Sequence, residues 1–145
     1  MIMLMLNNIK DRSFDIVIGL DVFEHIERSQ LNLYLTNISR ILKPGGYLIA
    51  RFPNCQSPNG VFTQYGDATH LSALSVPIFE HHANMSNLKL VNSKEGKAIE
   101  FYSENFLKKF FKKLIRESLK RLISVALSAG PTPLWADVIV TLKKV

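Results

Sequence analysis

The chain has 145 residues, of which 47% are hydrophobic and 21% are charged, proportions typical of a single globular domain. No apolar run reaches the roughly 18 residues needed to span a bilayer, and the single cysteine, Cys55, excludes an internal disulfide. We therefore expect a cytoplasmic protein. The net charge of +6 is concentrated between Lys97 and Arg121, where there are eight basic residues and three acidic ones, a net charge of +5.

The first part of the chain has the pattern of a strand, a helix and a second strand. The run FDIVIGL (Phe14–Leu20) is continuously apolar, which is typical of a strand covered on both faces in a parallel sheet. A helix is predicted next, because apolar residues repeat at three- and four-residue spacing: Leu31, Tyr34, Leu35, Ile38, Ile41 and Leu42. The helix ends at Pro44-Gly45-Gly46, and YLIARF (Tyr47–Phe52) is the second strand. This order predicts a βαβ unit with parallel strands.

The second part of the chain begins with a polar stretch, Cys55–Leu74, which is long for a loop and therefore a candidate for function. A short helix is predicted at Ser75–Met85 and a strand at Leu88–Ser93. A long basic helix is predicted at about Ser103–Ser128, and the run WADVIVTLKKV (Trp135–Val145) predicts a final strand.

Two segments together carry a family resemblance. FDIVIGLDVFEHI (14–26) followed by LKPGGYLIARFPN (42–54) resembles the second half of the class I S-adenosylmethionine-dependent methyltransferases. The resemblance implies an α/β fold with a Rossmann-like methyltransferase sheet, truncated to strands corresponding to four to seven, in one partial domain over 1–145. It also implies a helical insertion at 97–130 before the last strand. The loop SPNGVFTQYGDATHLSALS (57–75) resembles a subgroup found among enzymes of cell-surface polysaccharide biosynthesis.

One hallmark of that family does not occur in this sequence. The family binds its cofactor with a glycine-rich turn after strand one, where the backbone approaches the ligand closely. The seven glycines of this chain form no GxGxxG motif. We therefore expect a C-terminal half, in which FDIVIGL forms an unpaired apolar edge of the sheet. Because such edges pair with other chains, we expect a homo-oligomer or a complementing chain that carries the missing strands.

The resemblance implies S-adenosylmethionine as cofactor and methyl transfer to an oxygen or nitrogen of a small-molecule or glycan acceptor. By the same resemblance, Leu20, Asp21 and Val22 follow strand four and are the cofactor-binding candidates. The alternative is a non-catalytic remnant or subunit, which binds a partner chain or a membrane surface through the basic helix.

Asp21, Glu24 and His25 raise the question of a metal site. If Asp21 begins a helical turn, the three side chains share one face and could hold a divalent cation. Asp-x-x-Glu is also the pattern of a capping box, in which both carboxylates bind backbone N–H groups. We favour capping and assign no residue to a metal.

His70 and Asp67 are the catalytic candidates in the long polar stretch. Methyl transfer needs an acceptor that has lost its proton, and an imidazole oriented by a carboxylate is a suitable base. The alternative is structural, since Asp and Thr in loops commonly form turn hydrogen bonds and His70 could satisfy a backbone carbonyl.

The basic helix has alternative interpretations. Its apolar face and its lysine-rich face suit a helix lying at the periphery of an anionic membrane. We slightly favour a helix packed on its own domain with solvated lysines. Nucleic acid is not an expected partner, because the basic stripe lacks interleaved aromatic residues and no duplex-reading motif is present.

Overall fold

The computed structural model describes residue 6 and residues 8–96, 106–126 and 132–145. The order of elements is β1 (Phe14–Leu20), η1 (Phe23–His25), η2 (Arg28–Gln30), α2 (Leu31–Ile41), β2 (Leu42–Pro53), α3 (Pro58–Gly66), α4 (Val76–Asn84), β3 (Leu88–Gly96), α5 (Phe106–Ala126) and β4 (Asp137–Lys144).

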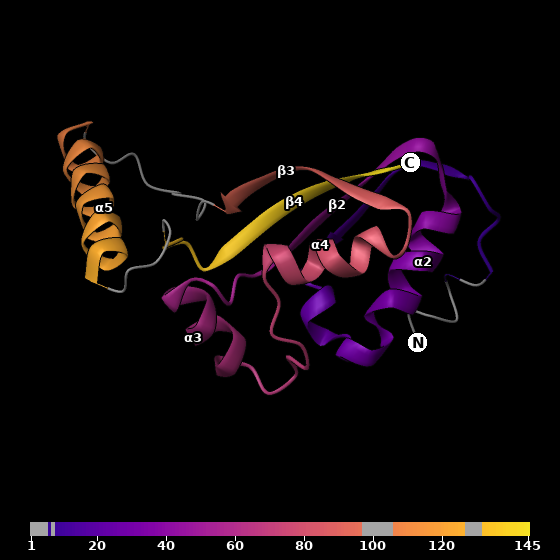
Figure 1. Ribbon diagram of the computed structural model, residues 1–145, viewed down its shortest axis with the longest axis horizontal. Coiled ribbons are helices and arrows are strands. Elements are labelled where there is room, and N and C mark those ends of the chain that lie inside the picture. Colours follow the sequence, from indigo (N-terminus) through magenta and orange to yellow (C-terminus); the bar gives the residue numbers. More distant parts are fainter. Residues whose placement is uncertain (1–5, 7, 97–105, 127–131) are drawn as a thin grey trace.

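The strands form one four-stranded sheet in the order β1-β2-β4-β3 (Figure 1). β1 and β2 are parallel and are connected through α2, which confirms the predicted βαβ unit. β4 is antiparallel to both of its neighbours, β2 and β3. The observed sheet is the Rossmann-like methyltransferase sheet expected from the resemblance, reduced to four strands within the described part of the chain.

The hydrophobic core lies between the sheet and the helices α2 and α4 (Figure 1). Alternate residues of β2 and β4 point into it, and each is fully or almost fully buried: Leu48, Ala50, Phe52, Val138, Val140 and Leu142. Phe79 of α4 lies at the centre, with its ring centroid 4.9 Å from that of Phe23 and 4.8 Å from that of Phe52. Burial of side chains of this size stabilises the fold by about 1.5–3 kcal/mol each.

β1 is an edge strand with a bare face. Among the described residues it pairs only with β2, as the resemblance led us to expect. The expectation that both faces of β1 are covered was wrong, because no described helix lies over one of them (Figure 1). The exposed fractions along that face are 42% for Phe14, 52% for Ile16, 62% for Ile18 and 50% for Leu20. An apolar edge of this kind is a surface for association.

Two boundaries differ from those that the sequence pattern predicted. β2 begins at Leu42 rather than at Tyr47, since the chain passes through Gly45 with a positive φ of 77° and continues to pair with β1. The stretch predicted as a long loop contains α3. Pro58 stands in the first turn of α3, where its missing N–H costs no hydrogen bond. Gly60 packs so closely that a Cβ atom there would lie 2.0 Å from the carbonyl oxygen of Asn54.

α5 contacts the rest of the described chain through polar groups. The Lys120 ammonium lies 3.2 Å from the carboxylate of Glu95, and the Arg116 guanidinium stacks 3.9 Å above the ring of Trp135. Most of its apolar side chains are nevertheless exposed, including Leu107, Phe110, Phe111, Leu114, Ile115 and Leu122.

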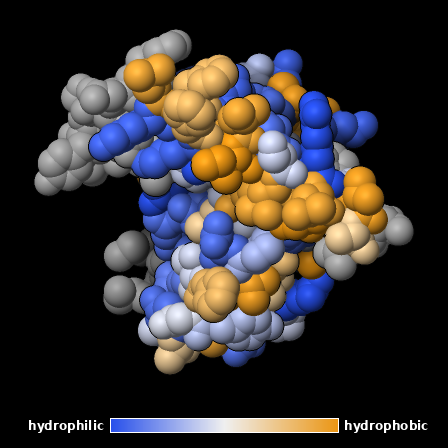
Figure 2. Space-filling model, turned by 90° about the vertical axis from the view of Figure 1, so that its left-hand side faces the viewer, coloured by the Kyte–Doolittle hydropathy of each residue, from blue (hydrophilic) through white to orange (hydrophobic). Residues whose placement is uncertain are grey.

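Figure 2 looks at the molecule from the α5 end and shows this apolar surface. Packing against the domain therefore covers only part of the apolar face that we expected it to cover. Both ends of the expected insertion, 97 and 130, lie outside the described residues. None of the helices in the described ranges has the length and apolar character of a membrane span.

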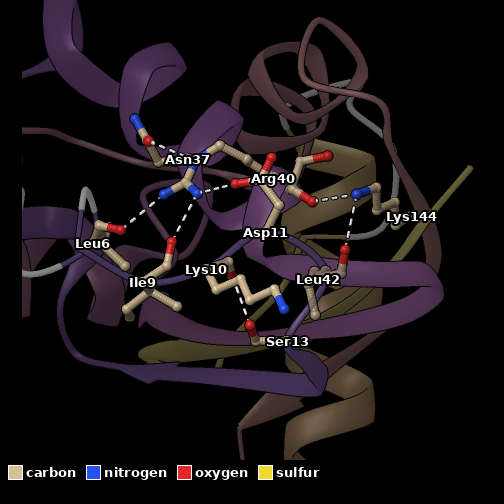
Figure 3. Close-up of polar contacts among 10 residues, drawn as sticks. Leu6, Ile9, Lys10, Asp11, Ser13, Asn37, Arg40, Leu42 and Lys144 are labelled. Atoms are coloured by element: carbon tan, nitrogen blue, oxygen red, sulfur yellow. Dashed lines mark hydrogen bonds and ion pairs between the residues drawn. The ribbon is translucent and has the colours of Figure 1, made fainter.

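The C-terminal end of α2 is held by long-range hydrogen bonds (Figure 3). Its last carbonyl groups have no partner within the helix, and the Lys144 ammonium donates to those of Ser39 and Leu42 at 2.6 and 2.8 Å. The Arg40 guanidinium reaches the other way and donates to the carbonyls of Leu6 and Ile9, both at 2.8 Å. Arg40 therefore joins α2 to the segment that precedes β1.

We expect Arg40→Met to lower the free energy of unfolding by about 1–3 kcal/mol, because two carbonyl groups lose a charged donor. Urea denaturation measures the change. Arg28→Met, at an exposed position of η2, is the control and should change stability by less than about 0.5 kcal/mol. Equal stabilities of the two variants would show that the Arg40 contacts contribute nothing.

The bare face of β1 predicts self-association. We expect the chain to sediment as a dimer or larger species and Ile18→Lys to shift it toward the monomer, because a lysine on this face disfavours burial. Leu33→Lys on α2 is the control, since Leu33 is similarly exposed at 48% but lies away from the edge. A monodisperse wild-type monomer in sedimentation velocity would contradict the prediction.

Candidate functional site

A cleft of about 480 Å³ opens where β1 and β2 end. Its lining residues come from four segments of the chain: Asp21, Glu24, Pro53, Thr63, Gly66, Asp67, His70 and Asp137. Open α/β sheets bind ligands beyond the carboxyl ends of their parallel strands, so the cleft lies where a ligand site is expected.

The loop after β1 is fixed by Arg51. Asp21 has a positive φ of 54°, and its N–H donates to the Arg51 carbonyl at 3.0 Å. The Arg51 guanidinium donates two hydrogen bonds to the Asp21 carboxylate, one from Nε to Oδ1 at 2.8 Å and one from Nη2 to Oδ2. η1 then begins at Phe23 without a side-chain cap, so the predicted capping box is wrong. Asp21 binds the neighbouring strand instead of the helix.

Glu24 is buried at the base of the cleft, with only 1% of its surface exposed. Its Oε2 atom finds no hydrogen-bond partner among the residues that the structure describes. Burial, and to a smaller extent the nearby Asp21 carboxylate, raises the pKa of Glu24. A buried carboxyl oxygen without a partner is costly, and such groups concentrate at functional sites.

The second loop is tied to the first through the backbone of Glu24. The amides of Leu71 and Ser72 both donate to the Glu24 carbonyl, at 2.7 and 2.9 Å. The Ser72 hydroxyl donates to the carbonyl of Ile26 at 2.5 Å. These contacts place His70, the residue before Leu71, close to the side chain of Glu24.

His70 and Asp67, the predicted catalytic pair, lie together. His70 Nε2 is 3.7 Å from Asp67 Oδ2, an ion-pair distance, and the His70 side chain is 7% exposed. The hydroxyl and amide of Thr69 donate to Asp67 Oδ1 at 2.7 and 2.8 Å, and these hydrogen bonds lower the pKa of Asp67. Asp67 is therefore an anion at neutral pH. His70 Nδ1 is buried and has no hydrogen-bond partner within the described ranges.

His25 joins the same cluster from the first loop. Its Nδ1 lies 3.0 Å from the Thr69 carbonyl oxygen, and its ring centroid is 4.8 Å from that of His70. The sequence pattern grouped His25 with Asp21 and Glu24. In the structure His25 and Glu24 cluster with His70 instead of Asp21. A separation of 45 residues hides this partner from any local pattern.

The three cofactor candidates lie at the rim of the cleft. Leu20 is half exposed at the end of β1, Asp21 lines the cleft, and Val22 packs against the core. Asp137, at the start of β4, also lines the cleft and was not singled out from the sequence, since an acid at a strand end carries no specific signal. Burial and then the nearby Asp21 carboxylate raise the pKa of Asp137, while the Arg51 guanidinium opposes them.

Residues 3–50 match the family model described as "Methyltransferase domain". No curated protein sequence matches the chain. Among solved structures, the chain is similar to a SAM-dependent methyltransferase from Archaeoglobus fulgidus, with a TM-score of 0.72 and 18% identity over 98% of this chain and 64% of that one. A SAM-dependent methyltransferase from Thermotoga maritima gives a TM-score of 0.58 at 17% identity, over 95% of this chain and 59% of that one.

A third similar structure holds ligands. It is the 1,6-didemethyltoxoflavin-N1-methyltransferase of Burkholderia thailandensis with bound 1,6-didemethyltoxoflavin and S-adenosylhomocysteine, at a TM-score of 0.56 and 12% identity, over 96% of this chain and 48% of that one. In all three comparisons the chain spans less than two thirds of the matched protein. The described fold is that of class I S-adenosylmethionine-dependent methyltransferases, over only part of their length.

The cleft carboxylates predict a pH-dependent stability. Because the pKa of Asp137 is raised in the fold, its ionised form destabilises the native state. The stabilising contribution of the protonated form is present at low pH and is lost as the pH rises through the folded pKa. We therefore expect Asp137→Asn to unfold at higher urea concentration than the wild type at pH 7, and the two curves to converge below about pH 4.

Glu27→Gln is the control for this experiment, since Glu27 is exposed and lies outside the cleft. Its substitution should leave the pH dependence of the urea midpoint unchanged. An Asp137→Asn curve that runs parallel to the wild-type curve at all pH values would contradict the assignment.

Proposed function

We propose that this cleft is the acceptor side of an S-adenosylmethionine-dependent methyltransferase site, which transfers a methyl group to an oxygen or nitrogen atom. The observation that carries the proposal is the meeting of two loops at the carboxyl ends of the parallel strands β1 and β2. They bring the His70–Asp67 pair and the buried Glu24 into one cleft. The methyltransferase fold of the described residues supports it.

The residues of the cleft fit the charges of the cofactor. S-adenosylmethionine carries a sulfonium and an ammonium group, and four carboxylates line the cleft: Asp21, Glu24, Asp67 and Asp137. Leu20, Asp21 and Val22 would border the methionine end of the cofactor from the tip of β1. When bound, the cofactor supplies an electrophilic methyl group. A homo-oligomer or a complementing chain would supply the opposite flank.

His70 would accept the proton of the acceptor. The Asp67 carboxylate lies 3.7 Å from Nε2 of the ring and would stabilise the positive charge that His70 acquires when it accepts a proton. In this arrangement Asp67 stabilises the protonated ring, and His70 removes the proton while the acceptor is positioned in line with the methyl group.

The acceptor would be a small molecule or a glycan. Phe62 and Tyr65 of α3 are 79% and 78% exposed, beside Thr63 and Gly66 of the cleft wall. Exposed aromatic rings next to polar side chains suit the apolar face and the hydroxyl groups of a sugar ring. The likeness of this loop to enzymes of polysaccharide biosynthesis supports a glycan with a reactive hydroxyl or amine.

A second candidate function rests on the exposed apolar surfaces. The bare face of β1 and the exposed side chains of α5 favour a subunit that binds a partner chain or, through α5, the periphery of a membrane. Phe110, Phe111 and Leu114 would enter the interface, and the neighbouring lysines would face anionic headgroups. In that case the chain would act without catalysing methyl transfer.

Cofactor binding separates the two candidates. We expect S-adenosylhomocysteine to bind the chain with a micromolar dissociation constant in titration calorimetry, and Asp21→Asn to weaken binding about tenfold. Asp15→Asn is a matched control, because each aspartate forms an ion pair with a residue of β2. Asp15 pairs with Lys43 near the start of β1, and Asp21 pairs with Arg51 just after the end of β1. Only the second pair borders the cleft.

Absence of binding to the wild type would support the non-catalytic subunit. Equal weakening by Asp15→Asn and Asp21→Asn would show that the effect comes from the sheet and not from the cleft.

The role of His70 predicts a specific kinetic loss. We expect His70→Gln to lower the transfer of labelled methyl groups to glycan hydroxyls or amines by about 10²–10⁴-fold, while the dissociation constant of S-adenosylhomocysteine stays unchanged. His81→Gln is the control, since His81 is exposed on α4 and lies outside the cleft. Full activity of the His70→Gln variant would exclude His70 as the base.

A further inference from the structure

We infer that Glu24, His25 and His70 form a binding site for one divalent transition-metal ion. One donor atom of each side chain lies within 4.8 Å of the donor atoms of the other two. Ligands bound to one ion at about 2.1 Å can be at most about 4.2 Å apart, so a small closing movement of the side chains is enough. The cluster joins both loops of the cleft, with two ligands from η1 and one from the loop after α3.

Two atoms of the cluster lack a partner that a cation would provide. Glu24 Oε2 and His70 Nδ1 are both buried, and neither has a hydrogen-bond partner among the residues described. Buried polar atoms are almost always satisfied, so an orphaned acceptor in a carboxylate beside an orphaned ring nitrogen needs an explanation. A divalent ion between them would bind both lone pairs and compensate the buried negative charge.

The third ligand, His25, is held by a hydrogen bond to the second loop. His25 Nδ1 lies 3.0 Å from the Thr69 carbonyl oxygen, which can accept only if Nδ1 carries the proton. This leaves Nε2 of His25 as the free lone pair. A carbonyl or carboxylate behind a ligating imidazole is the usual arrangement in metal sites, because it fixes the tautomer and the ring plane. The Asp67 carboxylate lies 3.7 Å from Nε2 of His70, an ion-pair distance that is too long for a hydrogen bond.

The donor set indicates which ions the site would select. Two imidazoles and one carboxylate suit Mn²⁺, Fe²⁺, Co²⁺ or Zn²⁺, whereas Mg²⁺ and Ca²⁺ prefer oxygen ligands. The remaining carboxylates of the cleft, Asp21, Asp67 and Asp137, make it attractive to cations in general. Three protein ligands leave coordination positions open toward the cleft, where another molecule could bind the ion.

Ion binding itself does not require methyl transfer, and only its use in catalysis rests on the proposed function. An ion on His70 Nδ1 would leave the ring without a lone pair for the proton of the acceptor, because Nε2 would then carry the ring proton. A hydroxyl group of the acceptor bound to the ion would then lose its proton at lower pH, and the proton would pass to water or to a cleft carboxylate. His70 would thus be a ligand in the ion-bound protein and a base only in the ion-free protein.

The test uses Co²⁺ as the probe, because its visible absorption reports coordination by nitrogen and oxygen. The full chain is treated with chelator, dialysed and titrated with Co²⁺ by calorimetry and absorption spectroscopy, in the absence of cofactor. We expect one ion per chain, a Co²⁺ spectrum that changes on binding, and no displacement by Mg²⁺. His25→Asn and His70→Asn should weaken binding at least about tenfold.

His81→Asn and Glu27→Gln are matched controls outside the cluster and should bind Co²⁺ like the wild type. Glu24→Gln tests the buried ligand. If that variant fails to fold, the His25→Asn variant still tests the metal site, since the His25 ring is exposed and its removal leaves the core intact.

Wild-type binding weaker than millimolar, or equal binding by His70→Asn and His81→Asn, would overturn the inference. Its failure is distinguishable from that of the proposed function. If the wild-type chain binds S-adenosylhomocysteine but not Co²⁺, the metal site alone is refuted. If the wild-type chain binds Co²⁺ but not S-adenosylhomocysteine, the methyltransferase proposal alone is refuted.

Discussion

The carbonyl oxygen of Glu24 is the point on which the candidate site depends. It accepts the amides of Leu71 and Ser72, and these two hydrogen bonds bring the loop before α4 against the short loop after β1. The first loop follows β1 and the second follows β2 and α3, and the two parallel strands end at the same edge of the sheet. The chain thus uses two backbone hydrogen bonds to place side chains 45 residues apart, His25 and His70, with ring centroids 4.8 Å from each other. Without this junction neither the cleft wall nor the cluster would exist.

The same junction explains why the site contains costly groups. Docking the second loop buries the side chains of Glu24 and His70 and removes water from them, which leaves Glu24 Oε2 and His70 Nδ1 without partners in the described structure. A fold selected only for stability would place an apolar residue at the position of Glu24, beside Phe23 and the core. Local departures of this kind from the rules of stable packing are expected where a side chain serves a ligand.

The sequence pattern predicts the sheet better than the site, and the reason is the range of the interactions. Apolar periodicity is local, so β1, α2, α4 and β3 could be predicted to within a few residues from their own side chains. α3 was missed because its nine residues carry no apolar stripe, and because Gly60 packs closely against the backbone of Asn54 and of Ala136, which is distant in the sequence. Asp21 was misread as a cap because its partner, Arg51, lies on the next strand. Asp67 and His70 could be grouped because they are only three positions apart in the sequence.

The exposed edge of β1 and the cleft are not independent features. Leu20, half exposed at the end of the edge, is followed directly by Asp21 in the cleft wall. A strand that paired in parallel with β1 would end beside Asp21, and its following loop would form the next part of that wall. Asp21, Asp67 and Asp137 would then face a second polypeptide instead of open solvent, and the lower dielectric would strengthen their attraction for a cation. Such a strand would pair with the open hydrogen-bonding edge of β1 and extend the charged cleft together, whereas the exposed side chains on the bare face of β1 would need a covering element above the sheet.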